Sequence, residues 1–145
     1  MTPLDYDFMK LAREVGTQSG CIRPLSRFGA VAVKNGEVLA SGYNGHVGEI
    51  PPCNECIRAK QKIKSGTRRE IANCICAEQR LICNSARDGV ALGGATIYVT
   101  GMPCPVCVRL IKAAGINRVI HPETYSNNES IEMAKLVGLE MITLI

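Results

Sequence analysis

The sequence has no tryptophan, and aromatic residues make up only 4 % of its 145 positions. Its formal net charge is only +4. Proteins that bind single-stranded nucleic acid combine a basic groove with aromatic side chains on which the bases stack, so this composition argues against a nucleic-acid partner. No stretch approaches the roughly 20 apolar residues of a membrane span. The polar, acidic start, residues 1–5, lacks a secretory pattern, and we therefore expect a cytoplasmic protein without membrane contact.

The length of the chain fits one globular domain over residues 1–145. Hydrophobic residues make up 46 % and charged residues 21 %, which is an ordinary globular composition. The eight cysteines are many for a cytosolic chain of this length. In a reducing compartment, metal binding or catalysis is a commoner use of cysteine than disulfide formation.

Hydrophobic periodicity and turn residues predict strands that alternate with helices. Asn35-Gly36 between two apolar runs predicts a hairpin. The long connection over residues 46–69 contains a basic, weakly helical piece, and a connection of that length is usually functional. The resulting order predicts a mixed sheet with helices on both faces. The helices are expected over 4–15, 71–87, 105–114 and 129–137, and the strands over 28–33, 38–43, 95–100, 117–121 and 139–145.

The most informative motif in the sequence is Cys76-Ala77-Glu78, together with the later Cys104-x-x-Cys107 pair. A catalytic zinc ion takes three protein ligands and keeps its fourth position for water. Both motifs fall near predicted helix N-termini, where the helix dipole and free N–H groups stabilise the thiolates that bind metal. We therefore predict one catalytic Zn²⁺ held by Cys76, Cys104 and Cys107. The alternative is a set of buried core cysteines.

Glu78 follows Cys76 by two residues and is spaced like a proton carrier beside the metal rather than like a ligand. Its alternative role is a first-turn glutamate that favours the helix dipole. Three thiolates carry one more negative charge than two thiolates with histidine, and this charge opposes ionisation of a zinc-bound water. Arg80 lies four residues after Cys76, on the same helix face. We therefore expect Arg80 to donate to a cysteine sulfur and offset that charge, with an ordinary surface arginine as the alternative.

On these residues the sequence resembles the cytidine deaminase-like superfamily, and most closely its deoxycytidylate (dCMP) deaminase branch. The resemblance covers nearly the whole chain. It implies a three-layer α/β/α sandwich around a five-stranded mixed sheet, and the zinc-dependent hydrolysis of dCMP to dUMP and ammonia. Water activated by zinc would attack C4 of the ring, with Glu78 carrying the protons. Besides the cysteine motifs, the residues that carry the resemblance are Ser19 with Cys21, 29–31, 42–45, Ser65-Gly66 with Arg68, 95–100, 114–119 and Tyr125.

The resemblance also implies the substrate contacts. Asn44 and Ala77 would touch the sugar or base. Tyr125 would stack on one of them, with a packing tyrosine as the alternative. Arginine suits a phosphate because its planar guanidinium binds two oxygens at once. The resemblance further implies a homo-oligomer, a hexamer or a dimer, with dCTP and dTTP as effectors. The candidate phosphate ligands are Arg23, Arg27, Arg68 and Arg69.

The chain departs from the dCMP deaminase branch at the site itself. Cys76 stands where that branch usually has histidine, and Arg80-Leu81 replaces its usual Asn-Ala. The segment 23–27 is also altered. These positions surround the substrate, so a free nucleoside or another aminated heterocycle is an alternative substrate. A non-catalytic zinc-binding module is the alternative from another class, and such a module has no use for Glu78.

The remaining cysteines offer a second metal site. Cys53 and Cys56 form another Cys-x-x-Cys pair, which Cys21 would join with Cys74 or His46. Four such ligands would close a structural zinc site. Free thiols in a loop are the alternative.

Overall fold

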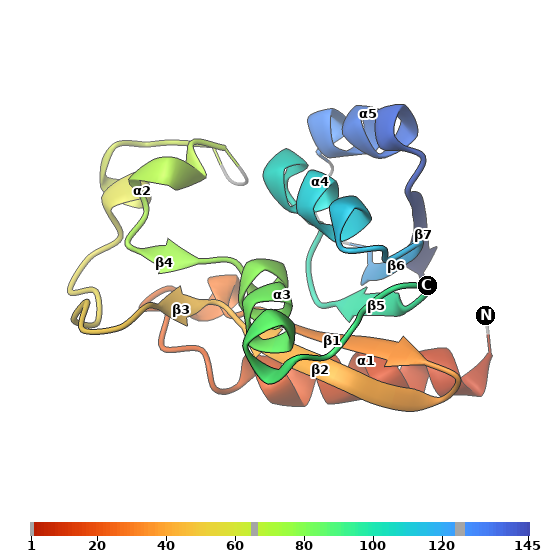
Figure 1. Cartoon of the computed structure of the whole chain (residues 1–145). Helices are drawn as coiled ribbons and strands as arrows, with labels where there is room; N and C mark the ends of the chain where they lie inside the picture. The colour runs from red at the N-terminus through yellow and green to blue at the C-terminus, as the bar shows by residue number, and fades with distance from the viewer. Residues whose placement is uncertain (1, 65–66, 124–126) are drawn as a thin grey trace.

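The computed structural model describes residues 2–64, 67–123 and 127–145, and a five-stranded sheet runs through its centre (Figure 1). The strands are β1 (Gly29–Lys34), β2 (Glu37–Tyr43), β5 (Thr96–Val99), β6 (Arg118–Pro122) and β7 (Glu140–Leu144). They lie in the order β2-β1-β5-β6-β7. β1 pairs antiparallel with β2 and β5, whereas β6 pairs parallel with β5 and β7. The predicted mixed sheet is confirmed.

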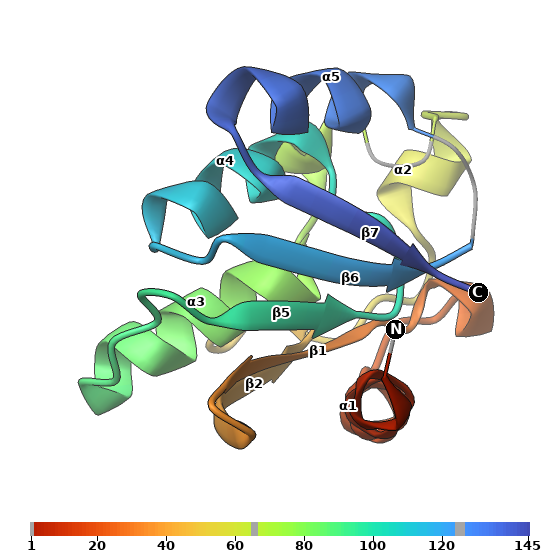
Figure 2. The same ribbon diagram turned by 90° about the vertical axis from the view of Figure 1, so that its right-hand side faces the viewer.

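Helices cover both faces of this sheet (Figure 2). One face is covered by α1 (Pro3–Gly16), whose Met9 packs with Val31 of β1. The other face carries α3 (Ala77–Asp88), α4 (Pro105–Ala113) and α5 (Asn128–Val137), and there Leu81 packs in one core with Ala30. Neighbouring residues of a strand point to opposite faces, so β1 contributes to both cores. The three-layer α/β/α sandwich is thereby confirmed.

The helix predicted over 71–87 is shorter than expected at its start. α3 begins at Ala77, with Cys76 as the residue that caps it, and the Cys76 N–H donates to Gln79 Oε1 at 2.8 Å. The preceding β4 (Cys74–Ile75) pairs with β3 (Gly45–His46), and this pairing keeps residues 74–75 extended. A short 3₁₀ turn, η2 (Arg69–Ile71), comes before them. Periodicity alone does not reveal the strand pairing, which is a tertiary interaction.

The long connection after β3 is organised around one buried arginine. It contains the single-turn helix α2 (Ile57–Lys60), where a weakly helical piece was predicted. The Arg58 side chain is only 5 % exposed. Its Nε donates to Thr67 O at 3.1 Å, and its Nη2 donates to Lys64 O at 3.1 Å. One guanidinium therefore ties α2 to the backbone at Lys64 and Thr67.

Small residues let α3 lie directly on the sheet. Ala30 and Gly42 face each other across β1 and β2, and Ala32 faces Ala40. A Cβ atom built on Gly42 would lie 2.4 Å from Leu81 N and 2.5 Å from Ala77 O. Both of these are backbone atoms of α3, so a larger residue at position 42 must displace the helix. Gly42 thus sets the distance between the sheet and the helix that carries Glu78.

We expect Gly42→Ala to lower the free energy of unfolding by about 3 kcal/mol, because overpacking against a rigid backbone costs that much. Gly20→Ala is the matched control, since a Cβ atom there meets nothing within 4 Å. The control should change stability by less than about 0.5 kcal/mol. Urea unfolding of the three proteins measures both effects, and equal stability of all three would show that α3 does not depend on Gly42.

Candidate active site

Three cysteine sulfurs meet where two helices begin on the same face of the sheet. Cys76 caps α3, Cys104 caps α4, and Cys107 lies in the first turn of α4. Their Sγ atoms all lie within 4.8 Å of one another. Throughout residues 2–64, 67–123 and 127–145, this is the only group of three or more His, Cys, Asp or Glu side chains whose ligand atoms lie close enough together to hold a metal ion. The sequence prediction brought together the same three residues.

The electrostatics of this cluster suit a cation. Hydrogen bonds from the thiols of Cys107 and Cys76 lower the pKa of Cys104, and the backbone N–H groups of Cys107 and Val106 lower it further. The same contacts with Cys104 raise the pKa of both Cys76 and Cys107. Three adjacent sulfurs therefore do not all ionise by themselves. Zn²⁺ would supply the missing charge, and thiolate sulfur is a ligand that it prefers, so the donor set fits zinc.

Glu78 lies beside the sulfurs in the first turn of α3. Its side chain is only 5 % exposed, and it lines the pocket that the cysteines border. Burial raises the pKa of Glu78 to about 7, and the charge of Cys104 adds to that effect. A carboxyl group with a pKa near neutrality can both take up and release a proton at working pH.

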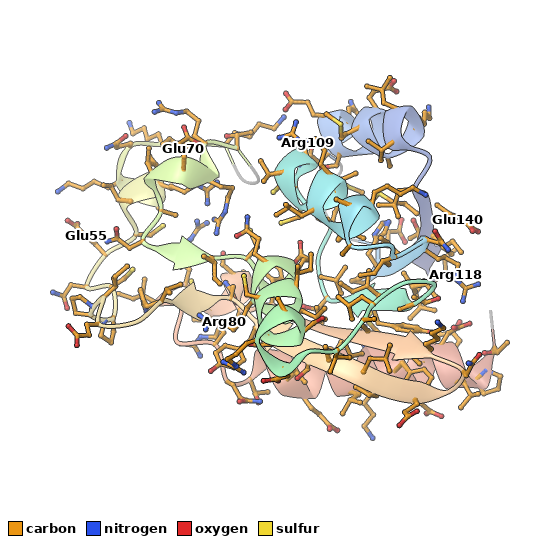
Figure 3. The ribbon with its side chains drawn as sticks, viewed as in Figure 1. Glu55, Glu70, Arg80, Arg109, Arg118 and Glu140 are labelled. Atoms are coloured by element: carbon orange, nitrogen blue, oxygen red, sulfur yellow. The ribbon has the colours of Figure 1, made fainter. Side chains whose placement is uncertain are left out.

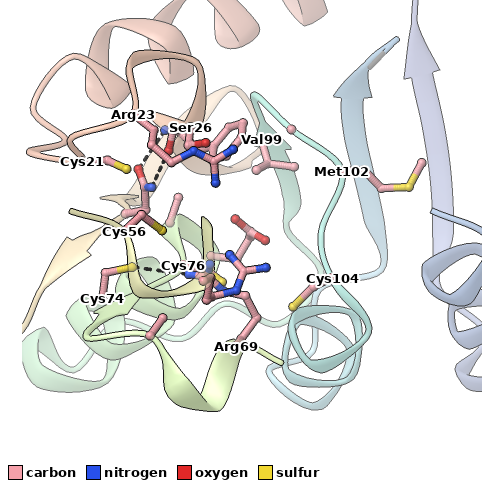
Figure 4. A pocket seen from close by; sticks show the side chains of 17 residues that line it. Cys21, Arg23, Ser26, Cys56, Arg69, Cys74, Cys76, Val99, Met102 and Cys104 are labelled. Atoms are coloured by element: carbon pink, nitrogen blue, oxygen red, sulfur yellow. Dashed lines mark hydrogen bonds between the residues drawn. The ribbon is translucent and has the colours of Figure 1, made fainter. Parts of the chain in front are cut away.

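A single pocket joins Glu78 and the cysteine cluster to a group of arginines (Figure 4). The pocket reaches from the C-terminal end of β5 to the connection between β3 and α3. Its lining mixes charged and polar side chains with small and apolar ones. It is formed by Cys21, Arg23, Ser26, Phe28, Asn44, Cys56, Arg58, Arg69, Ala72, Cys74, Cys76, Ala77, Glu78, Val99, Gly101, Met102 and Cys104.

Asn44 and Ala77 lie in the pocket wall, and their predicted contact with the sugar or base stays a prediction. The Asn44 side chain is buried and also holds the neighbouring loop. Its Oδ1 accepts from Phe28 N at 2.8 Å, and its Nδ2 donates to Ser26 O at 2.6 Å. Asn44 therefore fixes the pocket wall whether or not it also touches a ligand.

The arginine candidates divide into two groups. Arg23 and Arg69 line the pocket, whereas Arg27 and Arg68 do not. Arg27 Nε donates to Cys21 O at 2.9 Å, and Arg68 forms an exposed ion pair with Glu70 at 3.2 Å. Sequence reasoning missed Arg58, which also lines the pocket, because a basic stretch gives no sign that one of its members is buried. Tyr125, Ser65 and Gly66 lie outside the described residues.

The prediction for Arg80 is wrong. Its Nε donates to Tyr43 O at 2.8 Å, its Nη2 donates to His46 O at 2.6 Å, and its guanidinium lies 5.0 Å from the centre of the Tyr43 ring. Arg80 therefore ties α3 to the end of β2 and to β3 (Figure 3). The carbonyl groups at these strand ends attract the guanidinium, although the residue is four positions from Cys76. The arginine beside the sulfurs is Arg69, whose Nη2 lies 3.6 Å from Cys74 Sγ.

The cysteines predicted to hold a second metal lie around one end of the pocket. Cys21, Cys56 and Cys74 line it, and Cys53 Sγ lies 3.1 Å from His46 Nε2. In the described part of the chain, no three of these ligand atoms come within 4.8 Å of one another. The second metal site stays a prediction.

We compared the sequence and the fold with those of known proteins. Residues 3–122 match the model of the family described as "Cytidine and deoxycytidylate deaminase zinc-binding region". The chain belongs to this family. The resemblance seen in the sequence and the zinc chemistry predicted from the three cysteines are both confirmed at the level of the deaminase family.

Several deaminases resemble the chain over most of its length. The deoxycytidylate deaminase of Mycobacterium phage D29 is 36 % identical over 132 residues, which cover 85 % of this chain and 98 % of the phage enzyme. The Saccharomyces cerevisiae enzyme is 32 % identical over 93 % of this chain, which spans only 43 % of that longer protein. A crystal structure of dCMP deaminase from cyanophage S-TIM5, in complex with dCMP and dUMP, superposes with a TM-score of 0.81. It is 27 % identical and covers 99 % of both chains.

The raised pKa of Glu78 predicts that the free energy of unfolding of the metal-free protein depends on pH. The folded-state pKa of about 7 lies above the ordinary value of 4.5, so stability falls as the pH rises from 4.5 to 7. Glu78→Gln keeps the shape of the protonated group and should raise the free energy of unfolding by about 3 kcal/mol at pH 8. At pH 4 the two proteins should be equally stable. Urea unfolding after chelation measures this difference, and a difference that does not change with pH would contradict the assignment.

Proposed function

We propose that this protein hydrolyses dCMP to dUMP and ammonia with the aid of a zinc ion held by Cys76, Cys104 and Cys107. The observation that carries the proposal is Glu78, which is buried beside the three sulfurs with a pKa of about 7. A purely structural zinc site has no use for such a group. The likeness to a dCMP deaminase solved with dCMP and dUMP supports the same substrate.

Zn²⁺, when bound, would lower the pKa of a water in the pocket and provide the nucleophile near neutral pH. Glu78 takes a proton from that water as its oxygen bonds to C4 of the cytosine ring. Glu78 delivers the proton to the ring nitrogen, and a further proton transfer lets the C4 amino group leave as ammonia. Water is consumed, the C4–N bond breaks, and a C4 carbonyl remains. A group with a pKa near 7 suits both directions of proton transfer.

Arg23 is the best candidate in the pocket for the substrate phosphate. Arg58 already donates to the carbonyl groups of Thr67 and Lys64, and Arg69 lies against the sulfurs. Arg23 contacts Cys56 and faces the pocket. Its guanidinium therefore keeps donors for a phosphate, while Asn44 and Ala77 border the space for the sugar and base.

The assembly and regulation implied by the resemblance stay predictions: a hexamer or dimer, with dCTP and dTTP as effectors. The cytoplasmic location also stays a prediction. Among the described residues, no helix has both the length and the apolar character needed to cross a membrane.

The direct test is deamination by the zinc-loaded protein of dCMP, deoxycytidine, cytidine and cytosine in parallel. We expect selective conversion of dCMP, with a mass increase that reports replacement of the amino group by oxygen. Glu78→Gln should lower kcat by about 10³-fold, since general acid–base catalysis contributes that order of rate. Conversion of deoxycytidine at the same rate would identify a nucleoside enzyme, and no conversion at all would favour a zinc module without catalysis.

The phosphate assignment predicts a loss that depends on the substrate. Arg23→Gln should lower kcat/KM for dCMP by about 30-fold, because hydrogen bonds to a charged group are worth about 2 kcal/mol. The same variant should leave any residual deoxycytidine activity unchanged. Arg68→Gln is the comparison variant, since Arg68 is exposed and outside the pocket. A larger loss in Arg68→Gln than in Arg23→Gln would refute the assignment.

A further inference from the structure

Arg69 places a guanidinium against the sulfurs at the edge of the cysteine cluster. Its Nη2 lies 3.6 Å from Cys74 Sγ (Figure 4). The Cys76 side chain also interacts electrostatically with this guanidinium. Cys76 is one of the three residues that fit zinc, whereas Cys74 is not in that group. The guanidinium therefore lies outside the metal cluster and interacts with it electrostatically through Cys76.

The charge of Arg69 has no carboxylate partner in the parts of the chain that the structure describes. The four ion pairs found there involve other residues. Its Nε is buried and has no hydrogen-bond partner among the described atoms. Burying an arginine costs several kcal/mol unless an anion compensates it. The side chains that interact electrostatically with Arg69 are those of Cys74, Cys76 and Glu78.

The zinc site, in turn, would carry a negative charge that lacks a positive partner. Three thiolates around Zn²⁺ leave one net negative charge, whereas two thiolates and a neutral histidine leave none. A hydrogen bond from a cation to a thiolate draws electron density away from the metal and strengthens it as a Lewis acid. Groups that contact metal ligands in this way commonly change metal affinity or activity 10- to 100-fold.

We propose that Arg69 is the positioning residue that offsets the third thiolate, by donating from its guanidinium to Cys76 Sγ in the zinc-loaded protein. The inference rests on the proposed function, because the compensated charge matters most when the metal activates water. Arginine suits this role because it is always protonated and its planar group can donate to two sulfurs at once. In this role Arg69 compensates the charge of the metal site, and Arg23 remains as the arginine that binds the substrate phosphate.

The test compares Arg69→Gln and Arg69→Lys with the wild-type protein and with Arg87→Gln. Arg87 is an exposed arginine at the far end of α3, paired only with Asp88 among the described ion pairs, so its loss controls for net charge. The first readout is zinc affinity, measured without substrate by competition with a chromophoric chelator. Arg69→Gln should weaken zinc binding about 30-fold. Arg69→Lys should recover part of the loss, and Arg87→Gln should bind zinc like the wild type.

The second readout is the pH dependence of kcat. Removing the positive charge makes ionisation of the zinc-bound water harder, so the acidic limb of the profile should move to higher pH by about one unit. The ratio of kcat/KM for dCMP to that for deoxycytidine should change little. A purely structural role for Arg69 would lower stability without moving the pH profile.

The outcomes separate this inference from the proposed function. Unchanged zinc affinity in Arg69→Gln, or a lost preference for dCMP with normal zinc affinity, would overturn the inference and place Arg69 on the phosphate. A wild-type protein that fails to deaminate dCMP, but whose zinc affinity still depends on Arg69, would overturn the proposed function and keep the contact. If Arg69→Gln does not fold, the affinity and pH profile of Arg69→Lys decide the question.

Discussion

The mutual approach of three cysteine sulfurs is the constraint on which the rest of the site depends. Cys76, Cys104 and Cys107 lie within 4.8 Å of one another, too close for three thiolates without a cation between them. Two helix N-termini provide the partial positive charge that begins to compensate them. Zn²⁺ would complete the compensation, and Glu78 acquires its unusual pKa from the same buried surroundings.

The sheet holds this cluster by placing α3 at a fixed height above β2. Gly42 lets the helix backbone approach, and Arg80 ties the helix to the carbonyl groups of Tyr43 and His46. Asn44, directly after β2, pins the loop that forms the opposite pocket wall. Structural residues thus surround the reactive ones, and one of them, Arg80, stands at a position that differs from the usual dCMP deaminase pattern.

Local features of the sequence were enough to predict the strands, the hairpin and the three cysteines that come together. The two cysteine motifs depend on helix starts, which turn residues and periodicity mark in the sequence. Arg80 shows what the sequence does not reveal. Its position on the helix gives the direction of its side chain, but not which hydrogen-bond acceptors lie there. The short pairing of β3 with β4 joins residues about thirty positions apart and leaves no periodic signal.

We propose that the three thiols hold one zinc ion with its fourth position open. Zinc X-ray absorption spectroscopy of the protein loaded with one equivalent of metal tests this coordination. We expect three sulfur neighbours at about 2.3 Å and one oxygen neighbour at about 2.0 Å. A shell of four sulfurs would contradict the claim, because a closed site leaves no position for water and makes the metal structural.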